Sequence, residues 1–353
     1  MPVLHSARRV SAAATLFLLA LGGCSHDNGP SEFNPTGATA DVNAAETAFQ
    51  SPAATSYAAL GADMSLAIGG SAAVVSSPAL ALSGTSGRER YARAVTRMLP
   101  STSRIQASVA ALPSSVLGKT YVWDTTNGVY VQSDLSGAPS NGVRFVLYAV
   151  NPVTLRPVDP LNEVGYVDVI DESGSSTIAV RVLVVSNGTT YLDYSVHAGG
   201  TSSSGTVTVS GYASDGSVRA NFNLENTITQ TSSGVTLVLD YGLDVPSRNL
   251  ELDWTVTLSS SGDQTQVAVD LTIDGENGRV NLKGTTVDGT GTFTVKVNGD
   301  LFATITYAGG GDPVITGASG HVLAAEEEET LRTILGYYEE SFVVFVSLLA
   351  PIG

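Results

Sequence analysis

The side chains that could perform chemistry are few and scattered along the 353 residues of the chain. Cys24 is the only cysteine, and beyond the first 25 residues histidine occurs only at His26, His197 and His321. Acyl transfer and zinc chemistry need a nucleophile or several ligands at short, fixed spacings, as in GxSxG or HExxH. The chain contains neither motif and no cysteine cluster. We therefore expect a protein that is not an enzyme and that has no metal site and no cofactor.

Carboxylates alternate with apolar residues along several predicted strands, which raises the question of a cation site. Hairpins closing at 246–248 and 260–263 would place Asp244 opposite Glu251 and Asp253 opposite Asp270. Like charges directly across a ladder are unfavourable, and Ca²⁺, which favours carboxylate oxygens, could offset that repulsion. The continued register places Lys283 opposite Asp270. We favour the interpretation that these residues form an ordinary solvated face with partial charge pairing.

The first residues have the order of an export signal. Arg8 and Arg9 give a positive start, and residues 12–21, AAATLFLLAL, form an apolar run. A helix that spans a bilayer needs roughly 20 apolar residues, so this run is typical of a signal rather than of a membrane span. Residues 1–23 are therefore predicted to be a signal peptide that is removed from the mature chain.

The segment that ends this run, LGGC, resembles the lipobox of bacterial lipoproteins. Leu21, Gly22, Gly23 and Cys24 match its four positions. The resemblance implies lipidation of Cys24, with a diacylglycerol on its sulfur and an acyl chain on its new amino group. Several acyl chains bind a membrane more firmly than one, because each buried methylene contributes about 0.8 kcal/mol. The family's sorting tendency, with Ser25 after the cysteine, implies a protein of the cell envelope, lipid-anchored at the outer membrane and facing the periplasm.

The charge balance argues against several kinds of partner. The chain has 17 basic and 33 acidic residues, a net charge of −16. Nucleic acids attract lysine and arginine, so no nucleic-acid partner is expected. Anionic lipid would also repel so acidic a chain, so we expect contact with the membrane through the lipid anchor.

Four segments follow the signal peptide. Residues 24–40 are polar and rich in Gly and Pro, as in a flexible lipidated tether. Residues 41–113 are rich in Ala and Ser, and the stretches at 41–50 and 87–100 are predicted to be short helices, while the role of residues 61–87 stays open. A β region at 118–310 and an amphipathic-to-apolar helix at 319–350 complete the chain.

Residues 118–310 alternate apolar and polar side chains over run after run. Period two over such lengths predicts strands with one apolar and one wet face. Asn-Gly and Asp-Gly pairs suit the tight turns between them, and they occur at 127–128, 187–188, 215–216, 277–278 and 298–299. The expected fold class is mainly β: a large antiparallel up-and-down meander of about fourteen strands, as a curved sheet, half-barrel or barrel. Residues 143–150 and 178–185 are apolar on both faces, so short N-terminal helices are expected to cover their outer side.

The C-terminal segment predicts a helix whose end must be buried. Four glutamates at 326–329 suit the positive N-terminal end of a helix, and the apolar run at 342–350 is too short to cross a bilayer. We expect this helix to pack on the concave apolar face of the sheet. The candidate ligand-binding residues are then Leu250, Leu252 and Trp254 on the sheet and Phe342 and Phe345 on the helix.

Two functions of different class remain, with a third ranked below them. The favoured one is non-enzymatic binding of a hydrophobic ligand, a lipid or acyl chain, by an exported lipoprotein. In architecture this is similar to the half-barrel lipoproteins and lipid carriers of bacterial envelopes. The alternative is a structural or interaction lipoprotein with a fully packed core. The third is an enzyme that acts on envelope glycans through paired carboxylates. Apolar surface beyond what the helix covers would favour the first, and a filled interior the second.

Overall fold

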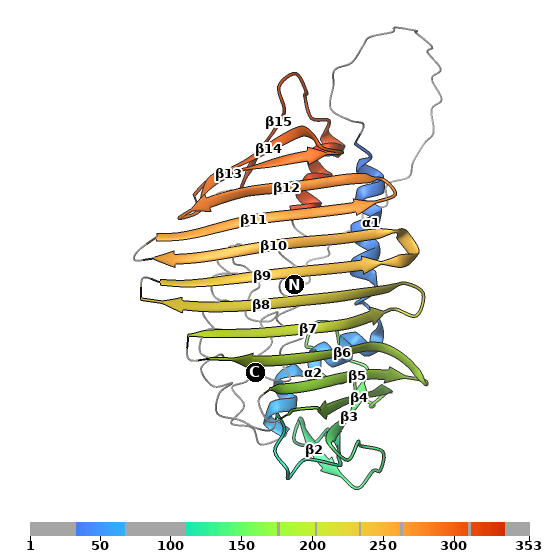
Figure 1. Ribbon diagram of the computed structural model, residues 1–353. Helices are drawn as coiled ribbons and strands as arrows, with labels where there is room; N and C mark the ends of the chain where they lie inside the picture. The colour runs from blue at the N-terminus through green and yellow to red at the C-terminus, as the bar shows by residue number, and fades with distance from the viewer. Residues whose placement is uncertain are drawn as a thin grey trace, which may run out of the picture.

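The computed structural model describes residues 33–67, 111–174, 177–201, 203–232, 234–261, 264–309 and 312–335. One mixed but mostly antiparallel sheet dominates the fold, and Figure 1 shows two N-terminal helices behind it. The helices are α1 (Pro35–Thr47) and α2 (Pro52–Ala67), followed at the other end of the chain by a helix at residues 325–335. The strands are β1 (Lys119–Asp124), β2 (Val129–Ser133), β3 (Gly142–Tyr148), β4 (Glu163–Asp171), β5 (Ile178–Ser186), β6 (Thr189–Gly200), β7 (Ser204–Ser214), β8 (Arg219–Thr231), β9 (Gly234–Val245), β10 (Leu250–Ser261), β11 (Gln264–Gly275), β12 (Gly278–Val287), β13 (Thr290–Val297), β14 (Asp300–Ala308) and β15 (Val314–Gly317), with a 3₁₀ turn η2 (Pro246–Arg248) between β9 and β10.

The predicted antiparallel meander is confirmed. The sheet has 15 strands, and from β3 to β15 each strand pairs with its neighbour in sequence. The sheet is open, because β2 and β15 form two separate edges. One strand pairing differs from the predicted antiparallel meander. β1 pairs in parallel with β3, so β2 lies on the other side of β1 and forms the edge of the sheet.

Tight turns connect the strands where the sequence predicts them. Asn187 and Gly188 have φ angles of 48° and 77°, and Asn298 and Gly299 have 51° and 97°. Positive φ at both central residues is the geometry of the hairpin turn that matches the twist of the flanking strands. These dipeptides therefore set the first pairs of the β5–β6 and β13–β14 hairpins, and beyond those pairs a β-bulge shifts the register, between Val184 and Val185 and between Val295 and Lys296.

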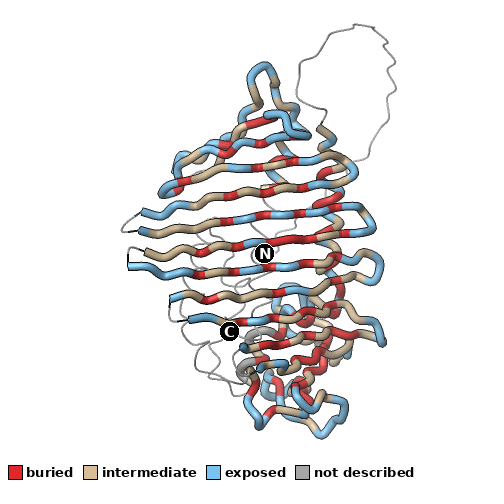
Figure 2. Tube along the Cα trace, viewed as in Figure 1, coloured by how far each residue is buried: buried red, intermediate tan, exposed pale blue. Residues whose placement is uncertain are grey.

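The two faces of the sheet differ as the period-two pattern requires. Figure 2 shows buried and exposed residues alternating along the central strands. On β10, Leu252, Trp254 and Val256 are buried, whereas Asp253 and Thr255 are exposed. We call the side with the buried apolar residues the core face and the opposite side the outer face.

Helix α1 begins earlier than the sequence suggests. The Asn34 side chain caps it by accepting a hydrogen bond of 3.0 Å from the Gly37 amide, and Pro35 occupies the first turn. Residues 35–40, expected to be part of the tether, are therefore helical. The helix predicted at 41–50 is present within α1, whereas the one predicted at 87–100 lies outside the described residues.

Both N-terminal helices pack on the core face, not on the outer side of the early strands, so that prediction was wrong. The ring of Phe49 lies 5.7 Å from that of Phe222 on β8, and the Tyr57 hydroxyl lies 2.6 Å from that of Tyr194 on β6. Phe222 and Tyr194 alternate with exposed or half-exposed neighbours and belong to the core face.

The outer side of the early strands instead carries charged pairs. Arg144 forms a bidentate ion pair with Asp168, with both N–O distances at 2.7 Å. Arg181 pairs in the same way with Asp193, at 2.8 Å. Such pairing satisfies a sheet face without a covering helix, because each guanidinium bonds both oxygens of its carboxylate.

The helix at 325–335 also packs on the core face. Leu331 and Ile334 are buried in the same hydrophobic core as the sheet residues. Its Thr330 hydroxyl lies 3.2 Å from that of Thr39 on α1, so the two helices are neighbours. The expected packing of the C-terminal helix is confirmed for this part, and the candidate residues Phe342 and Phe345 lie outside the described residues.

Candidate ligand-binding face

The three candidate residues of the sheet lie on the core face, on one strand. Leu250, Leu252 and Trp254 have exposed fractions of 0%, 1% and 3%. Trp254 packs against Tyr241 of β9, with ring centroids 4.6 Å apart and ring planes tilted by 45°. The structure therefore brings these three residues together as part of the core.

Helix α1 is fixed above this end of the sheet by a buried carboxylate. Asp41 accepts hydrogen bonds from Arg248 at 3.1 and 3.3 Å and from Asn277 at 3.0 Å. Arg248 belongs to the β9–β10 turn and Asn277 to the β11–β12 turn, so α1 crosses the ends of these hairpins, as Figure 1 shows. Leu250 lies beneath α1. Gly275, the last residue of β11, is close to both the Leu250 side chain and the Asp41 carboxylate.

The apolar contribution of α1 to this packing is small. Its buried residues are Ala38, Asp41, Val42 and Ala45, and of these only Val42 has a branched aliphatic side chain. Burial of a large aliphatic side chain contributes about 1.5–3 kcal/mol, and alanine far less. The attachment of α1 therefore depends to a large extent on its polar contacts.

Helix α2 is attached differently, through larger apolar groups and one buried hydroxyl pair. Tyr57, Leu60 and Met64 are buried, and α2 contacts strands β2 to β6. Burial raises the pKa of Tyr57 and of Tyr194 well above the ordinary value for tyrosine. The Tyr57–Tyr194 pair is therefore a neutral hydrogen bond at every physiological pH.

The core face continues past α1 along the strands. Two rows of residues cross the sheet there, and we call them the distal rows: Val207, Asn226, Leu239, Val256 and Val269 on β7 to β11 in the first, and Ile228, Leu237, Leu258 and Val267 on β8 to β11 in the second. The first row lies four residues from Phe222 along β8, which corresponds to about 13 Å. Between β7 and β11, the described helices lie toward the strand ends that carry the β9–β10 turn (Figure 1).

Most of the distal rows are buried, and their far end is only partly so. Leu237, Leu239 and Val256 are buried, whereas Leu258 and Val267 are half-buried. Leu258 and Val267 face each other across β10 and β11, close to the turn that joins these strands. Apolar surface of the core face therefore reaches solvent at this end.

The acidic ladder of the outer face is only partly as predicted. Asp244 lies opposite Glu251, as expected, but Asp253 lies opposite Thr272 and not opposite Asp270. The reason is that Ser261 pairs with Gln264, which centres the hairpin one residue later than expected and moves every partner by two. A shift of two keeps each side chain on its face.

Two acids of this ladder, Asp244 and Asp270, have hydrogen-bond partners. Asp270 accepts hydrogen bonds from Lys283 at 2.6 Å and from Asn281 at 3.0 Å. The hydrogen bond from Lys283 is the main cause that lowers the pKa of Asp270 below its ordinary value. Asp244 accepts a hydrogen bond of 3.0 Å from Asn221. This arrangement agrees with a solvated, partly paired face.

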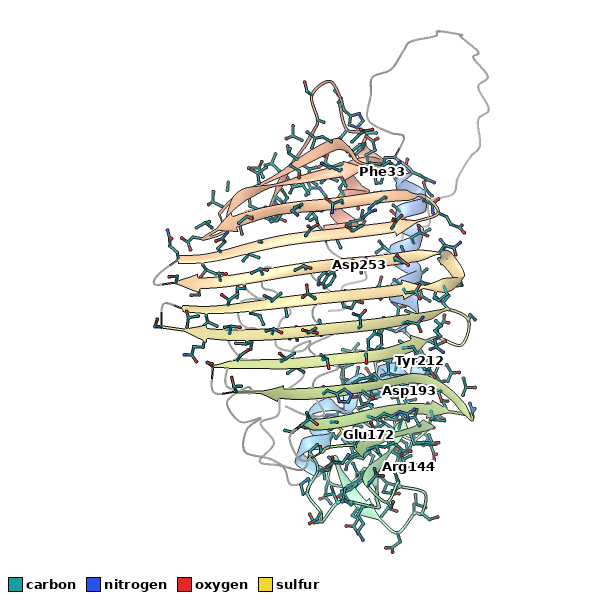
Figure 3. All side chains as sticks on the ribbon, viewed as in Figure 1. Phe33, Arg144, Glu172, Asp193, Tyr212 and Asp253 are labelled. Atoms are coloured by element: carbon teal, nitrogen blue, oxygen red, sulfur yellow. The ribbon has the colours of Figure 1, made fainter. Side chains whose placement is uncertain are left out.

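Two arginines on the outer face lie over tyrosine rings. The guanidinium of Arg144 is 3.6 Å from the ring centroid of Tyr166, and that of Arg219 is 3.7 Å from that of Tyr212. Figure 3 labels Arg144 and Tyr212, together with Asp193 and Asp253, along this series of strands. Because arginine occupies these ring faces, they are not free to stack on a ligand.

The two histidines of the described segments, His197 and His321, do not come together. His197 is exposed on the outer face of β6, whereas His321 lies 3.1 Å from a carboxylate oxygen of Glu327 and packs on the ring of Phe302. Among the described residues, no group of three or more His, Cys, Asp or Glu is placed to hold a metal ion. The helices of the described segments are also too short or too polar to cross a membrane.

Asn226 is a residue of the core face that the sequence analysis did not single out. It continues the apolar series Ala220, Phe222 and Leu224 on β8, and Ile228 follows it. An amide at a buried position of a period-two strand is the signal that identifies it.

Comparison of the chain with protein-family models, curated proteins and solved structures finds no match.

Proposed function

We propose that this protein is an exported lipoprotein, anchored through Cys24, whose core face binds a hydrophobic ligand such as a lipid or acyl chain. The observation that carries the proposal is that the apolar core face continues past the described helices, through the distal rows, to a half-buried end at Leu258 and Val267. A 12-residue strand such as β10 is about 40 Å long, and a helix about 10 Å wide that crosses it covers about a quarter of that length. The distal rows supply a further apolar stretch of this face.

The half-buried residues at the end of the distal rows give such a ligand an entrance. Leu258 and Val267 keep part of their surface in contact with solvent, next to the buried Leu237 and Val256. A chain that enters there would replace water on these side chains, and each methylene that it buries contributes about 0.8 kcal/mol. Sites for apolar ligands are lined in this way, mostly by hydrophobic groups with few polar ones.

A second candidate is a structural or interaction lipoprotein, and one observation favours it. Leu250, Leu252 and Trp254 are almost completely buried, and α1 and α2 are joined to the sheet by specific polar contacts. Leu237, Leu239 and Val256 of the distal rows are each 1% exposed, so in this candidate the packed core extends across the whole face. The two candidates therefore differ in what occupies the distal rows.

The deciding experiment uses the full chain carrying Cys24→Ala, which lacks the acyl acceptor and is purified without detergent. Native mass spectrometry, followed by organic extraction, should detect a lipid that is bound without a covalent bond. Leu239→Glu places a charge in the first distal row and should abolish this binding, whereas Thr257→Glu on the outer face of β10 is the matched control. Absence of extractable lipid, together with no uptake of a fluorescent fatty acid, would leave the packed-core candidate.

A further inference from the structure

Asn226 lies at the middle of the core face. β8 is the eighth of the 15 strands in spatial order, and Asn226 lies near the centre of that strand. Its exposed fraction is 5%. Within the described part of the chain, its side-chain oxygen Oδ1 is buried and has no hydrogen-bond partner.

The register surrounds Asn226 with aliphatic side chains. Val207 lies opposite it on β7 and Leu239 opposite it on β9. Leu224 and Ile228 flank it on its own strand and point to the same face. An unpaired buried acceptor is costly, and native proteins leave very few, so each one calls for an explanation.

A trapped water explains this acceptor poorly. Buried waters typically make about three hydrogen bonds and need two to four polar partners. The four neighbours that the sheet gives Asn226 are apolar and offer none. A partner that brings one donor on an otherwise apolar body fits these surroundings better than water does.

The absence of charged side chains in the distal rows limits which kind of group can donate a hydrogen bond to Oδ1 of Asn226. The distal rows contain no carboxylate, so a cationic donor would be buried without a counter-charge, at a large cost. A carboxylate head group has no proton to donate at neutral pH. The remaining donor is a neutral O–H or N–H group that is carried along the apolar part of the ligand.

We infer that the distal rows bind an acyl chain that carries a hydroxyl or amide group along its length, and that this group donates a hydrogen bond to Oδ1 of Asn226. The inference rests on the proposed function and names its ligand class. The rest of the chain lies on Ile228, Leu237, Leu258 and Val267, toward the half-buried end of the rows. Asn226 thus selects among acyl chains, whereas the apolar residues hold any of them.

The test measures the displacement of a fluorescent fatty acid from the full chain carrying Cys24→Ala. The competitors are 12-hydroxyoctadecanoic acid, octadecanoic acid and octadecanoic acid with an amide group within its chain. The protein should prefer the hydroxylated or amide-bearing chain about five-fold or more, the factor given by one hydrogen bond of about 1 kcal/mol. The hydroxyl and amide arms distinguish the two donors.

Asn226→Leu should remove this preference and bind octadecanoic acid at least as tightly as the parent does. Asn226→Ala serves as a second variant if leucine disturbs the packing. Asn223→Ala, three residues earlier on the outer face of the same strand, should keep the preference. Equal binding of all three acids by the parent protein would overturn the inference and leave the proposed function standing. Binding of none of them would overturn both.

Discussion

The hydroxyls of Tyr57 and Tyr194 lie 2.6 Å apart and join α2 to β6 inside the apolar core. Both side chains are buried, and burial raises the pKa of each, so neither ionises at physiological pH. Each hydroxyl is the hydrogen-bond partner of the other. Their burial therefore costs little free energy of folding only while both hydroxyls are present.

Tyr57→Phe should therefore destabilise the protein by about 1–3 kcal/mol, since it leaves the Tyr194 hydroxyl buried without its partner. The double variant Tyr57→Phe with Tyr194→Phe should be closer to the parent in free energy of unfolding than either single variant. Urea unfolding of all four proteins measures this coupling. Tyr191→Phe, at a half-buried tyrosine of the same strand, is the control and should change little. Additive effects of the two substitutions would contradict the expected coupling.

The ion pair between Asp41 and Arg248 should respond unequally to the loss of its two members. The Asp41 side chain is 4% exposed and that of Arg248 is 40% exposed. Arg248→Met leaves a buried carboxylate with only Asn277, and should cost about 1–2 kcal/mol, below the 3–5 of a fully buried pair because Arg248 is partly solvated. Asp41→Asn should cost less, because the arginine can turn to solvent.

Thermal unfolding of both variants, with Arg279→Met as the comparison, checks this asymmetry. Arg279 and Asp274 form an exposed pair at 3.7 Å, so its removal should have almost no effect. If Asp41→Asn proves more damaging than Arg248→Met, the carboxylate supports α1 through Asn277 rather than through the ion pair.

The pair between Asp270 and Lys283 should contribute to stability only above acidic pH. The pKa of Asp270 is lowered in the folded protein. As the pH falls, the Asp270 carboxylate is therefore protonated at a higher pH in the unfolded chain than in the folded protein. The contribution is complete above the ordinary aspartate pKa of about 3.9, and is lost as the pH falls through the lower value of the folded state. Lys283→Met should thus be slightly less stable than the parent at neutral pH, and equal to it in strong acid.

Urea midpoints of the two proteins across this pH range measure the difference. Lys296→Met, which removes a charge from the exposed end of β13, is the control for net charge. A difference that persists unchanged below the folded-state pKa would show that Lys283 acts through its packing.

Lipidation is tested at Cys24 itself. Because Cys24 is the proposed acyl acceptor, Cys24→Ser should give a soluble or uncleaved protein, and metabolic labelling with palmitate should mark only the parent. Ser25→Asp should leave the label in place and move the protein to the inner membrane, since the residue after the cysteine influences sorting. Label that persists in Cys24→Ser would end the lipoprotein proposal.

The outline of the fold could be predicted from the sequence because each hairpin is local. The alternation on β8, β9 and β10 and the Asn-Gly turns together determine which residues face the core and which strands pair. The pairing of Asp244 with Glu251 followed correctly from the short turn at Pro246–Arg248. Asp253 was misplaced because the position of a turn within a run of Ser and Gly is not determined by the pattern.

The positions of the helices could not be predicted in this way. The apolar runs of β3 and β5 show that both faces of these strands are largely apolar. They do not show which of the two faces a helix covers. That choice depends on single side chains far away in sequence, such as Tyr57 with Tyr194 or Asp41 with Arg248. The parallel pairing of β1 with β3 likewise depends on the path of the 134–141 connection, where Gly137 lies beside the Arg144 guanidinium.

The partners of α1 also determine the order in which the molecule can be completed. Asp41 is bonded to Arg248, 207 positions later, and Thr36 and Thr39 reach Glu326 and Thr330, 290 and 291 positions later. During synthesis this helix is made before the hairpins and the helix that receive it. The strands β7 to β10, which α2 does not cover, are therefore made before α1 can dock on its hairpins, and a holding chaperone would be needed most at that stage.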